Sequence, residues 1–269
     1  MDLHDYRDVA ENYDRYLQVM YETEDHFENF QEFYYELAKA YGQGGVVDIA
    51  CGTGAVLLYL AERGVDVDGT DLSEEMCRVA ASKAEKMCLR LRIWPADMTR
   101  FSSGRKYSLA IIARSGFMHL PTPELQRAAL LNIRDQLAEG GILTLNTFDP
   151  LPFLQVAQMA TGPEDYTFRL EYVNSEGRRE KIYNAIAYDP VPQLMRGSWK
   201  FETLDDAGNA VEARVRPLTM RQTYRQEFRW LAELCGFEVV EVYKDYRRTP
   251  ADGQPSSLIW VLRKRNKIR

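Results

Sequence analysis

Residues 47–54, Val-Asp-Ile-Ala-Cys-Gly-Thr-Gly, constrain the fold of this chain more than any other segment. An apolar run passes directly into a turn with glycines at alternate positions, and an amphipathic stretch, residues 55–63, follows. Glycine lets backbone amides approach a ligand where a Cβ would collide, and the N-terminus of the next helix adds exposed N–H groups. The segment therefore predicts a strand, a ligand-binding turn and a helix. Because many α/β folds carry such a turn, the rest of the chain must specify the ligand.

Short apolar strands alternate with longer amphipathic helices around this turn. Apolar runs predict strands over residues 46–50, 65–71, 89–94, 107–113, 142–148, 237–243 and 257–262. Apolar residues at three- and four-residue steps predict helices over residues 6–20, 27–41, 55–63, 123–137 and 221–234, with Gly140-Gly141 ending the fourth of these. Ser73 is suited to cap a further helix through the backbone amide of Met76. The alternation predicts an α/β fold with a seven-stranded, mainly parallel, Rossmann-like sheet covered on both faces.

Residues 166–220 follow a different pattern. Apolar and polar residues alternate there with a period of two, broken by turn-forming segments at 175–177, 189–190 and 205–209, which predicts antiparallel hairpins. The predicted organisation is an N-terminal helical lid over residues 1–41, a core over 42–150 and 221–265, and an antiparallel insertion over 151–220. The insertion is a reasonable surface for homodimer formation or for binding a substrate.

Composition excludes several classes of protein. No apolar run exceeds seven residues, far short of the about 20 that cross a bilayer, so no membrane span is expected. The N-terminus lacks the basic-then-apolar pattern of a secretion signal, and the four cysteines form no C-x-x-C pair, which favours a cytoplasmic protein without a disulfide frame or metal site. A net charge of −6 disfavours nucleic acid as a partner.

Two acidic residues at predicted strand ends point to a nucleoside ligand. Asp71 closes the second strand, 23 residues after Asp48, where a carboxylate can accept both ribose hydroxyls. Asp97, followed by Met98, closes the third strand, where it can accept an adenine amino group. The third glycine of a dinucleotide fingerprint is replaced by Leu57, so a pyrophosphate site is incomplete. Asp48 and Asp71 are alternatively structural residues, the first bonding the turn and the second capping the helix after it.

Together these landmarks resemble the class I S-adenosylmethionine-dependent methyltransferases over roughly residues 45–150 and again near 236. The resemblance also includes the segment Glu139-Gly140-Gly141-Ile142-Leu143 before the fifth strand. It implies S-adenosylmethionine as cofactor and S-adenosylhomocysteine as product. In that family Gly52 and Gly54 would border the methionine part, and Leu72 would cover the adenine. The implied cofactor-binding set is Tyr13, Asp48, Ala50, Gly52, Gly54, Asp71, Leu72, Asp97, Met98 and Arg114.

Missing motifs narrow the range of possible methyl acceptors. Nucleic-acid amino-methylating enzymes of this superfamily carry Asp/Asn-Pro-Pro-aromatic after the fourth strand, whereas this chain has Arg114-Ser115-Gly116-Phe117. The Pro-Cys pair of pyrimidine carbon-5 enzymes and the paired glutamates of arginine methyltransferases are also absent. The layout is similar to small-molecule methyltransferases, including amino-sugar N,N-dimethyltransferases and glycine N-methyltransferases. This predicts methyl transfer to a small-molecule N or O nucleophile. The alternatives are a cofactor-binding regulatory or partner-dependent subunit without transfer of its own, and an RNA methyltransferase.

Two residues are candidates for a role in catalysis. The run Tyr6-x-x-Val-Ala-x-x-Tyr13-Asp14 is similar to an N-terminal pattern that packs over the cofactor, so Tyr13 either shapes the closed site or packs its helix on the core. His119 follows the fourth strand and is either a base or a polar loop residue. Residues 1–36 hold eleven Asp or Glu against two Arg, a balance of −9, which favours an amine acceptor unless this face is simply solvated.

Overall fold

The computed structural model describes residues 10–23, 29–149, 165–253 and 257–265. The helices are α1 (Tyr13–Thr23), α2 (Phe30–Tyr41), α3 (Ala55–Glu62), α4 (Glu74–Lys86), α5 (Pro123–Gln136) and α7 (Arg225–Leu234), with short 3-10 helices η2 (Gly42–Gly44) and η3 (Gly116–His119). The strands are β1 (Val46–Ile49), β2 (Val67–Asp71), β3 (Ile93–Pro95), β4 (Tyr107–Ile112), β5 (Leu137–Phe148), β6 (Thr167–Val173), β7 (Arg179–Asp189), β8 (Leu194–Leu204), β9 (Ala210–Arg221), β10 (Phe237–Tyr243) and β11 (Ser257–Lys264).

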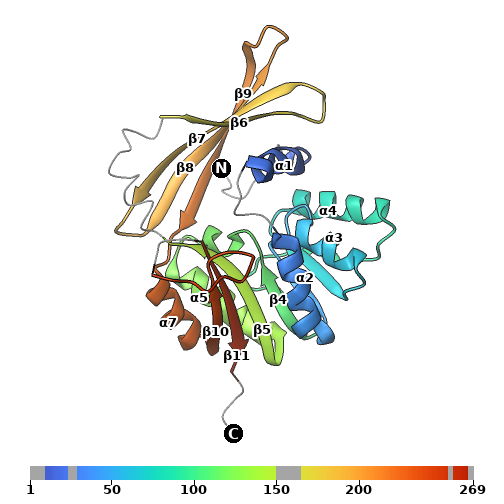
Figure 1. Cartoon of the computed structure of the whole chain (residues 1–269), viewed down its shortest axis with the longest axis vertical. Coiled ribbons are helices and arrows are strands. Elements are labelled where there is room, and N and C mark those ends of the chain that lie inside the picture. Colours follow the sequence, from blue (N-terminus) through green and yellow to red (C-terminus); the bar gives the residue numbers. More distant parts are fainter. Residues whose placement is uncertain (1–9, 24–28, 150–164, 254–256, 266–269) are drawn as a thin grey trace.

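Seven strands form one sheet in the order β10-β11-β5-β4-β1-β2-β3. Only β11 runs antiparallel to its neighbours, and the remaining pairs are parallel. One core cluster joins the sheet to α5 and α7, and a second joins it to α2 and α3, so both faces are covered (Figure 1). The predicted fold class is therefore confirmed. Because the parallel strands end at one edge, the residues after β1, β2, β3 and β4 lie close together.

Local signals explain most element boundaries. Ser73 caps α4 as predicted, since its hydroxyl accepts a hydrogen bond from the Met76 amide at 3.3 Å. The predicted third strand began at Leu89, but β3 begins at Ile93, because the Leu89 amide bonds to the Ala84 carbonyl at 2.9 Å and closes α4. Gly140-Gly141 does not end a helix either. It forms an irregularity inside β5, where the pairing with β4 shifts and Gly140 has a φ of 71°.

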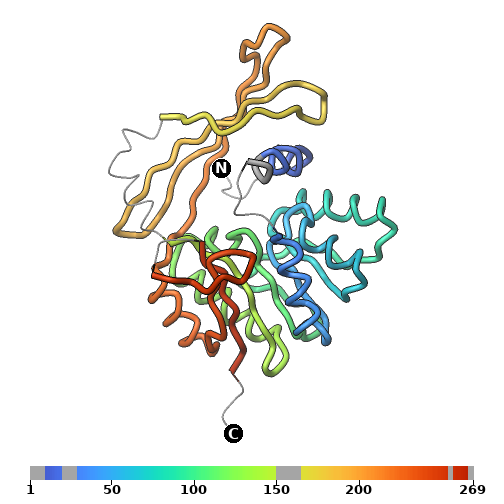
Figure 2. The backbone as a smooth tube through the Cα atoms, viewed as in Figure 1, coloured from blue at the N-terminus to red at the C-terminus, as the bar shows by residue number. Residues whose placement is uncertain are grey.

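Strands β6–β9 form a separate antiparallel sheet between β5 and α7 in the sequence. Its inner face packs at one end on Tyr16 and Leu17 of α1, and at the other end on Met118 of η3. Figure 2 shows α1 between this sheet and the core, although α1 and the strands of the small sheet are distant in the sequence. The small sheet and α1 therefore close over the strand ends of the core.

The two N-terminal helices pack differently. Phe30, Phe33, Tyr34 and Leu37 of α2 are buried in the second core cluster, whereas α1 packs on the small sheet. Because α2 is part of the core, we restrict the proposed lid to α1. The predicted start of the first helix, including Tyr6, lies outside the described residues.

In the described part of the chain, no helix combines the length and the apolar character that crossing a membrane requires.

Candidate functional site

A pocket lies at the carboxyl edge of the parallel strands, where the sequence predicts the ligand. Its lining includes nine of the ten residues in the predicted cofactor set, with His119 beside them: Tyr13, Asp48, Ala50, Gly52, Asp71, Leu72, Asp97, Met98 and Arg114. Gly54 is not among the lining residues. Elements from across the first half of the chain thus converge on one cavity, with α1 contributing Tyr13 to its wall.

The turn after β1 leaves open space where a ligand is expected. Gly52 has a φ of 56°, and a Cβ added to it would meet no atom within 4 Å. Gly54 has a different purpose, since an added Cβ would lie 3.1 Å from Leu58 and 3.3 Å from Ala80. The expectation that both glycines border the cofactor is therefore supported in geometry for Gly52, whereas Gly54 allows α3 and α4 to pack closely.

Asp71 holds the turn in this shape. One carboxylate oxygen accepts a hydrogen bond from the Gly52 amide at 2.8 Å, and the other accepts one from the Ser73 amide at 2.8 Å. Asp71 therefore does cap the start of the segment that leads into α4, which was the structural alternative to ribose binding. Its side chain also lines the pocket. The two roles are compatible because each carboxylate oxygen can accept more than one hydrogen bond.

Asp48 is a buried acid of the site with a raised pKa. It is 1% exposed, and within the described structure its Oδ1 has no hydrogen-bond partner. Its pKa is raised to about 8, chiefly by burial and to a smaller extent by the charge of nearby Asp71. A hydrogen bond from the Leu57 backbone amide acts in the opposite direction. A buried acid with an unsatisfied oxygen beside open space suits a cationic ligand group. The residues present therefore fit a cofactor that carries positive charge.

The ends of β2 and β3 form a more exposed part of the wall. Leu72 is 49% exposed, a position suited to covering a flat ring. Asp97 Oδ1 accepts hydrogen bonds from the Thr99 amide at 2.9 Å and the Thr99 hydroxyl at 2.8 Å. Asp97 Oδ2 lies 3.4 Å from Arg100, whose side chain is 82% exposed. The Asp97 carboxylate therefore shapes its own turn, and its outer oxygen pairs only with a solvated side chain.

The turn after β4 contributes Arg114 and His119 to the pocket lining. Arg114 and Ser115 have left-handed backbone, with φ of 53° and 65°, a strained conformation that is common at functional sites. The turn carries the chain into η3, where His119 lines the pocket. The Arg114 guanidinium lies 5.6 Å from the centre of the Tyr13 ring. Tyr13 and Arg114 therefore lie close together, and His119 lines the same pocket.

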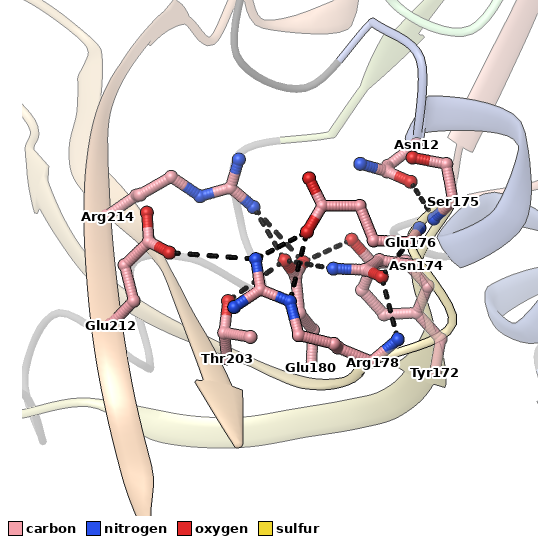
Figure 3. Close-up of polar contacts among 10 residues, drawn as sticks. All are labelled: Asn12, Tyr172, Asn174, Ser175, Glu176, Arg178, Glu180, Thr203, Glu212 and Arg214. Carbon is pink, nitrogen blue, oxygen red and sulfur yellow. Dashed lines mark hydrogen bonds and ion pairs between the residues drawn. The ribbon is translucent and has the colours of Figure 1, made fainter. Parts of the chain in front are cut away.

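The contacts that fix α1 over the pocket were not predicted from the sequence. Asp14 accepts a hydrogen bond from the Thr53 hydroxyl at 2.6 Å and pairs with Lys83 at 2.7 Å. Asn12 accepts one from the Ser175 amide at 2.7 Å, which ties the start of α1 to the β6–β7 hairpin (Figure 3). Thr53 lies between the two glycines of the turn, so α1 is bonded directly to the turn after β1. The Tyr13-Asp14 pattern was the only sequence signal for this contact.

In the part of the chain that the structure describes, no group of three or more His, Cys, Asp or Glu side chains is arranged to hold a metal ion.

Known proteins share this sequence and this fold. Residues 46–141 match the methyltransferase domain family. The chain is 30% identical to a glycine/sarcosine N-methyltransferase of Aphanothece halophytica, over 87% of this chain and 81% of that protein. It is 31% identical to a dTDP-3-amino-3,4,6-trideoxy-alpha-D-glucopyranose N,N-dimethyltransferase of Streptomyces venezuelae, over 37% and 40% of the two chains.

Solved structures give the same fold. An S-adenosylmethionine-dependent methyltransferase from Clostridium acetobutylicum superposes with a TM-score of 0.74 at 15% identity, covering 89% of this chain and 92% of that one. An amino pentose methyltransferase from Micromonospora echinaspora, solved with S-adenosylmethionine bound, superposes with a TM-score of 0.65 at 19% identity, covering 89% and 91%. The chain belongs to the class I S-adenosylmethionine-dependent methyltransferases. It is an enzyme, and S-adenosylmethionine is its cofactor.

Proposed function

We propose that this enzyme transfers a methyl group to the nitrogen or oxygen of a small molecule, and that an amine is the preferred acceptor. The observation that carries the proposal is a pocket at the carboxyl edge of the parallel strands that Tyr13 of α1 lines together with Arg114 and His119. The relatives with sequence similarity include enzymes named for N-methylation of glycine and of an amino sugar, which supports an amine acceptor.

The predicted cofactor residues fit S-adenosylmethionine group by group. Gly52 would leave room for the methionine part, and Asp71 would accept the ribose hydroxyls while keeping its bond to the turn. Leu72 and Asp97 would enclose the adenine, and Arg114 would face the carboxylate. Asp48, neutral below pH 8 when the pocket holds no cation, would ionise against the positive charge of the cofactor.

The residues near the acceptor need to do little chemistry. When bound, S-adenosylmethionine supplies a methyl group that the sulfonium already activates, so the protein chiefly aligns the acceptor and excludes water. Tyr13 presents its ring to the pocket from α1 and is held there by the Asp14 contacts. We assign it to alignment and closure. We assign His119, which lines the same pocket, to accepting the proton that an amine loses.

Incubation with methyl-labelled S-adenosylmethionine and a panel of acceptors tests the proposal. The panel contains small amino acids, amino sugars, hydroxylated sugars without an amine, and tRNA. We expect label in at least one amine. Tight cofactor binding with no transfer to any acceptor would favour a regulatory or partner-dependent subunit. Label that enters only tRNA would replace the proposal with RNA methylation.

A further inference from the structure

We propose that Glu180 on β7 of the small sheet is a positioning residue for methyl transfer. It is not among the residues that line the pocket. It acts through Tyr172 and Asn174 on the start of α1, the helix that contributes Tyr13 to the pocket wall. The inference concerns the alignment of the established reaction. Only its rate measurement rests on the proposed function, because that measurement needs an acceptor.

Glu180 joins all four strands of the small sheet. Its side chain is buried, with 2% exposed, and both carboxylate oxygens accept hydrogen bonds (Figure 3). The donors are the hydroxyl of Tyr172 on β6, the amide of Asn174 after β6 at 3.1 Å, the hydroxyl of Thr203 on β8 at 3.2 Å and the guanidinium of Arg214 on β9 at 2.9 Å. A buried polar network whose hydrogen bonds are made holds its members in one arrangement. We therefore expect Glu180 to fix Tyr172 and Asn174 relative to the rest of the sheet.

The first route from Glu180 to α1 runs through the turn between β6 and β7. The Asn174 side chain donates to Glu180, and its Oδ1 accepts hydrogen bonds from two backbone amides of the turn at 3.0 and 2.9 Å. The amide of the next residue, Ser175, donates to Asn12 Oδ1 at 2.7 Å. The Asn12 carbonyl accepts a hydrogen bond from the Tyr16 amide at 3.3 Å, in the first turn of α1. Through Asn174, Glu180 therefore sets the position of the N–H group that binds the start of this helix.

The second route runs through aromatic rings. The ring centres of Tyr172 and Tyr16 are 5.9 Å apart, and those of Tyr16 and Tyr13 are 5.3 Å apart, both pairs edge to face. Edge-to-face contact is a favoured arrangement of aromatic rings. Glu180 accepts the hydrogen bond of the Tyr172 hydroxyl, and Tyr13 lines the pocket. The carboxylate is therefore linked to the pocket wall by ring contacts as well as by the turn.

These contacts point to alignment rather than to stability alone. A buried ion pair such as that of Glu180 and Arg214 adds little net stability, because the cost of desolvation offsets the attraction. Two of the four partners of Glu180, however, lie where the small sheet meets α1. Transfer from an activated donor depends on alignment of the reacting groups. Loss of the Glu180 contacts should therefore loosen α1 and slow transfer while the pocket residues themselves are unchanged.

Three single variants and one double variant test the inference. Glu180→Gln removes the charge and keeps the shape of the side chain. Asn174→Ala removes the link to the turn and leaves the ion pair of Glu180 with Arg214 in place. Asn12→Ala removes the corresponding bond on the side of α1. The double variant combines Glu180→Gln with Asn12→Ala.

Glu171→Gln is the matched control. Glu171 on β6 also pairs with an arginine, Arg179 on β7, at 2.6 Å. It immediately precedes Tyr172 in the strand, so its side chain points to the opposite face of the sheet. The control therefore removes an acid from the same two strands without touching the contacts with α1.

The first measurement is hydrogen exchange of backbone amides in protein saturated with S-adenosylhomocysteine. We expect exchange over residues 13–19 to be about tenfold faster in each single variant than in the wild type and the control. Exchange over α3 and α5 should be unchanged, which shows that the core is folded. If Glu180→Gln also speeds exchange in the core, Asn174→Ala decides the question, because it keeps the ion pair. Wild-type exchange over residues 13–19 in Asn174→Ala would overturn the inference.

The second measurement is the rate of transfer to the acceptor identified in the transfer panel. In each single variant kcat should fall about tenfold, and the KM for the acceptor should change by less than about threefold, because none of the three residues lines the pocket. The double variant should lose less than the product of the two single losses, since both act through α1. Losses that multiply fully, or a kcat equal to that of Glu171→Gln, would refute the positioning role. Exchange needs no acceptor, so it decides this inference even if no amine is methylated, an outcome that would refute the proposed function instead.

Discussion

Among single residues, Asp48 is the one that we expect to couple the stability of this enzyme to occupation of its pocket. Its pKa is about 8 in the folded chain because of burial, while an exposed aspartate in the unfolded chain has its ordinary value near 3.8. Folding therefore takes up a proton between these two values. The contribution of Asp48 to the free energy of unfolding of the cofactor-free protein should therefore be largest at low pH. It should decrease as the pH rises from about 4 to 8.

Asp48→Asn should remove this pH dependence. The amide carries no charge to bury, so the stability of the cofactor-free variant relative to the wild type should rise by about 4 kcal/mol between pH 4.5 and pH 8, as the shift of this pKa implies. Its affinity for S-adenosylmethionine should fall about tenfold or more, because the positive ligand loses an ionised partner. Urea unfolding at the two pH values and calorimetric titration measure both effects. A stability difference that does not change between the two pH values would contradict the raised pKa.

Among the elements, α1 has two sets of contacts that link separate parts of the molecule. Asp14 bonds it to Thr53 in the ligand-binding turn and to Lys83 on α4, while Tyr16 and Leu17 hold it to the small sheet. Rigid placement of this helix positions Tyr13 in the pocket wall. We therefore expect the position of this helix to decide whether the site is closed.

Asp14→Ala should separate closure from folding. The carboxylate is 46% exposed, so its loss should change the free energy of unfolding by less than about 1 kcal/mol. Turnover with the acceptor identified in the transfer panel should fall about 10- to 100-fold, because Tyr13 is no longer aligned. Glu11→Gln is the matched control, since Glu11 pairs with exposed Arg78 at 3.0 Å near the same helix. Equal turnover of the Asp14→Ala and Glu11→Gln variants would show that α1 does not control closure.

Deletion is a poorer test of the same helix. Removing residues 1–36 would also remove Phe30, Phe33 and Tyr34 of α2, which are buried against the core. Loss of activity after that deletion would report unfolding as much as loss of closure.

At the scale of the whole molecule, local patterns in the sequence predicted the core sheet well. The strand-helix alternation and the glycine turn identified the order of the elements, and the acids at strand ends identified the pocket, because parallel strands bring their ends to one edge. Boundaries failed where one backbone bond decided them, as at Leu89, whose amide closes α4.

Contacts between segments that are distant in the sequence could not be predicted from such local patterns. The bond between Asp14 and Thr53 joins residues 39 positions apart, and it depends on how the small sheet supports α1. The two faces of the small sheet depend on strand register, since a slip by one residue would turn each side chain of β9 to the opposite face. Sequence periodicity predicted the hairpins but gave no register between β8 and β9, so neither feature was available before the structure.

The most direct test of the whole account is calorimetric titration of S-adenosylmethionine into the wild type, Gly52→Val and Gly208→Val. Both glycines have left-handed backbone, with φ of 56° and 86°, and at both an added Cβ would meet no atom within 4 Å. The two substitutions therefore impose similar strain, but only Gly52 lies in the pocket wall. We predict that Gly52→Val weakens binding at least about 100-fold, about 2.7 kcal/mol, while Gly208→Val binds as the wild type does. Wild-type affinity in Gly52→Val would mean that the cofactor binds elsewhere and that the assignment of this pocket is wrong.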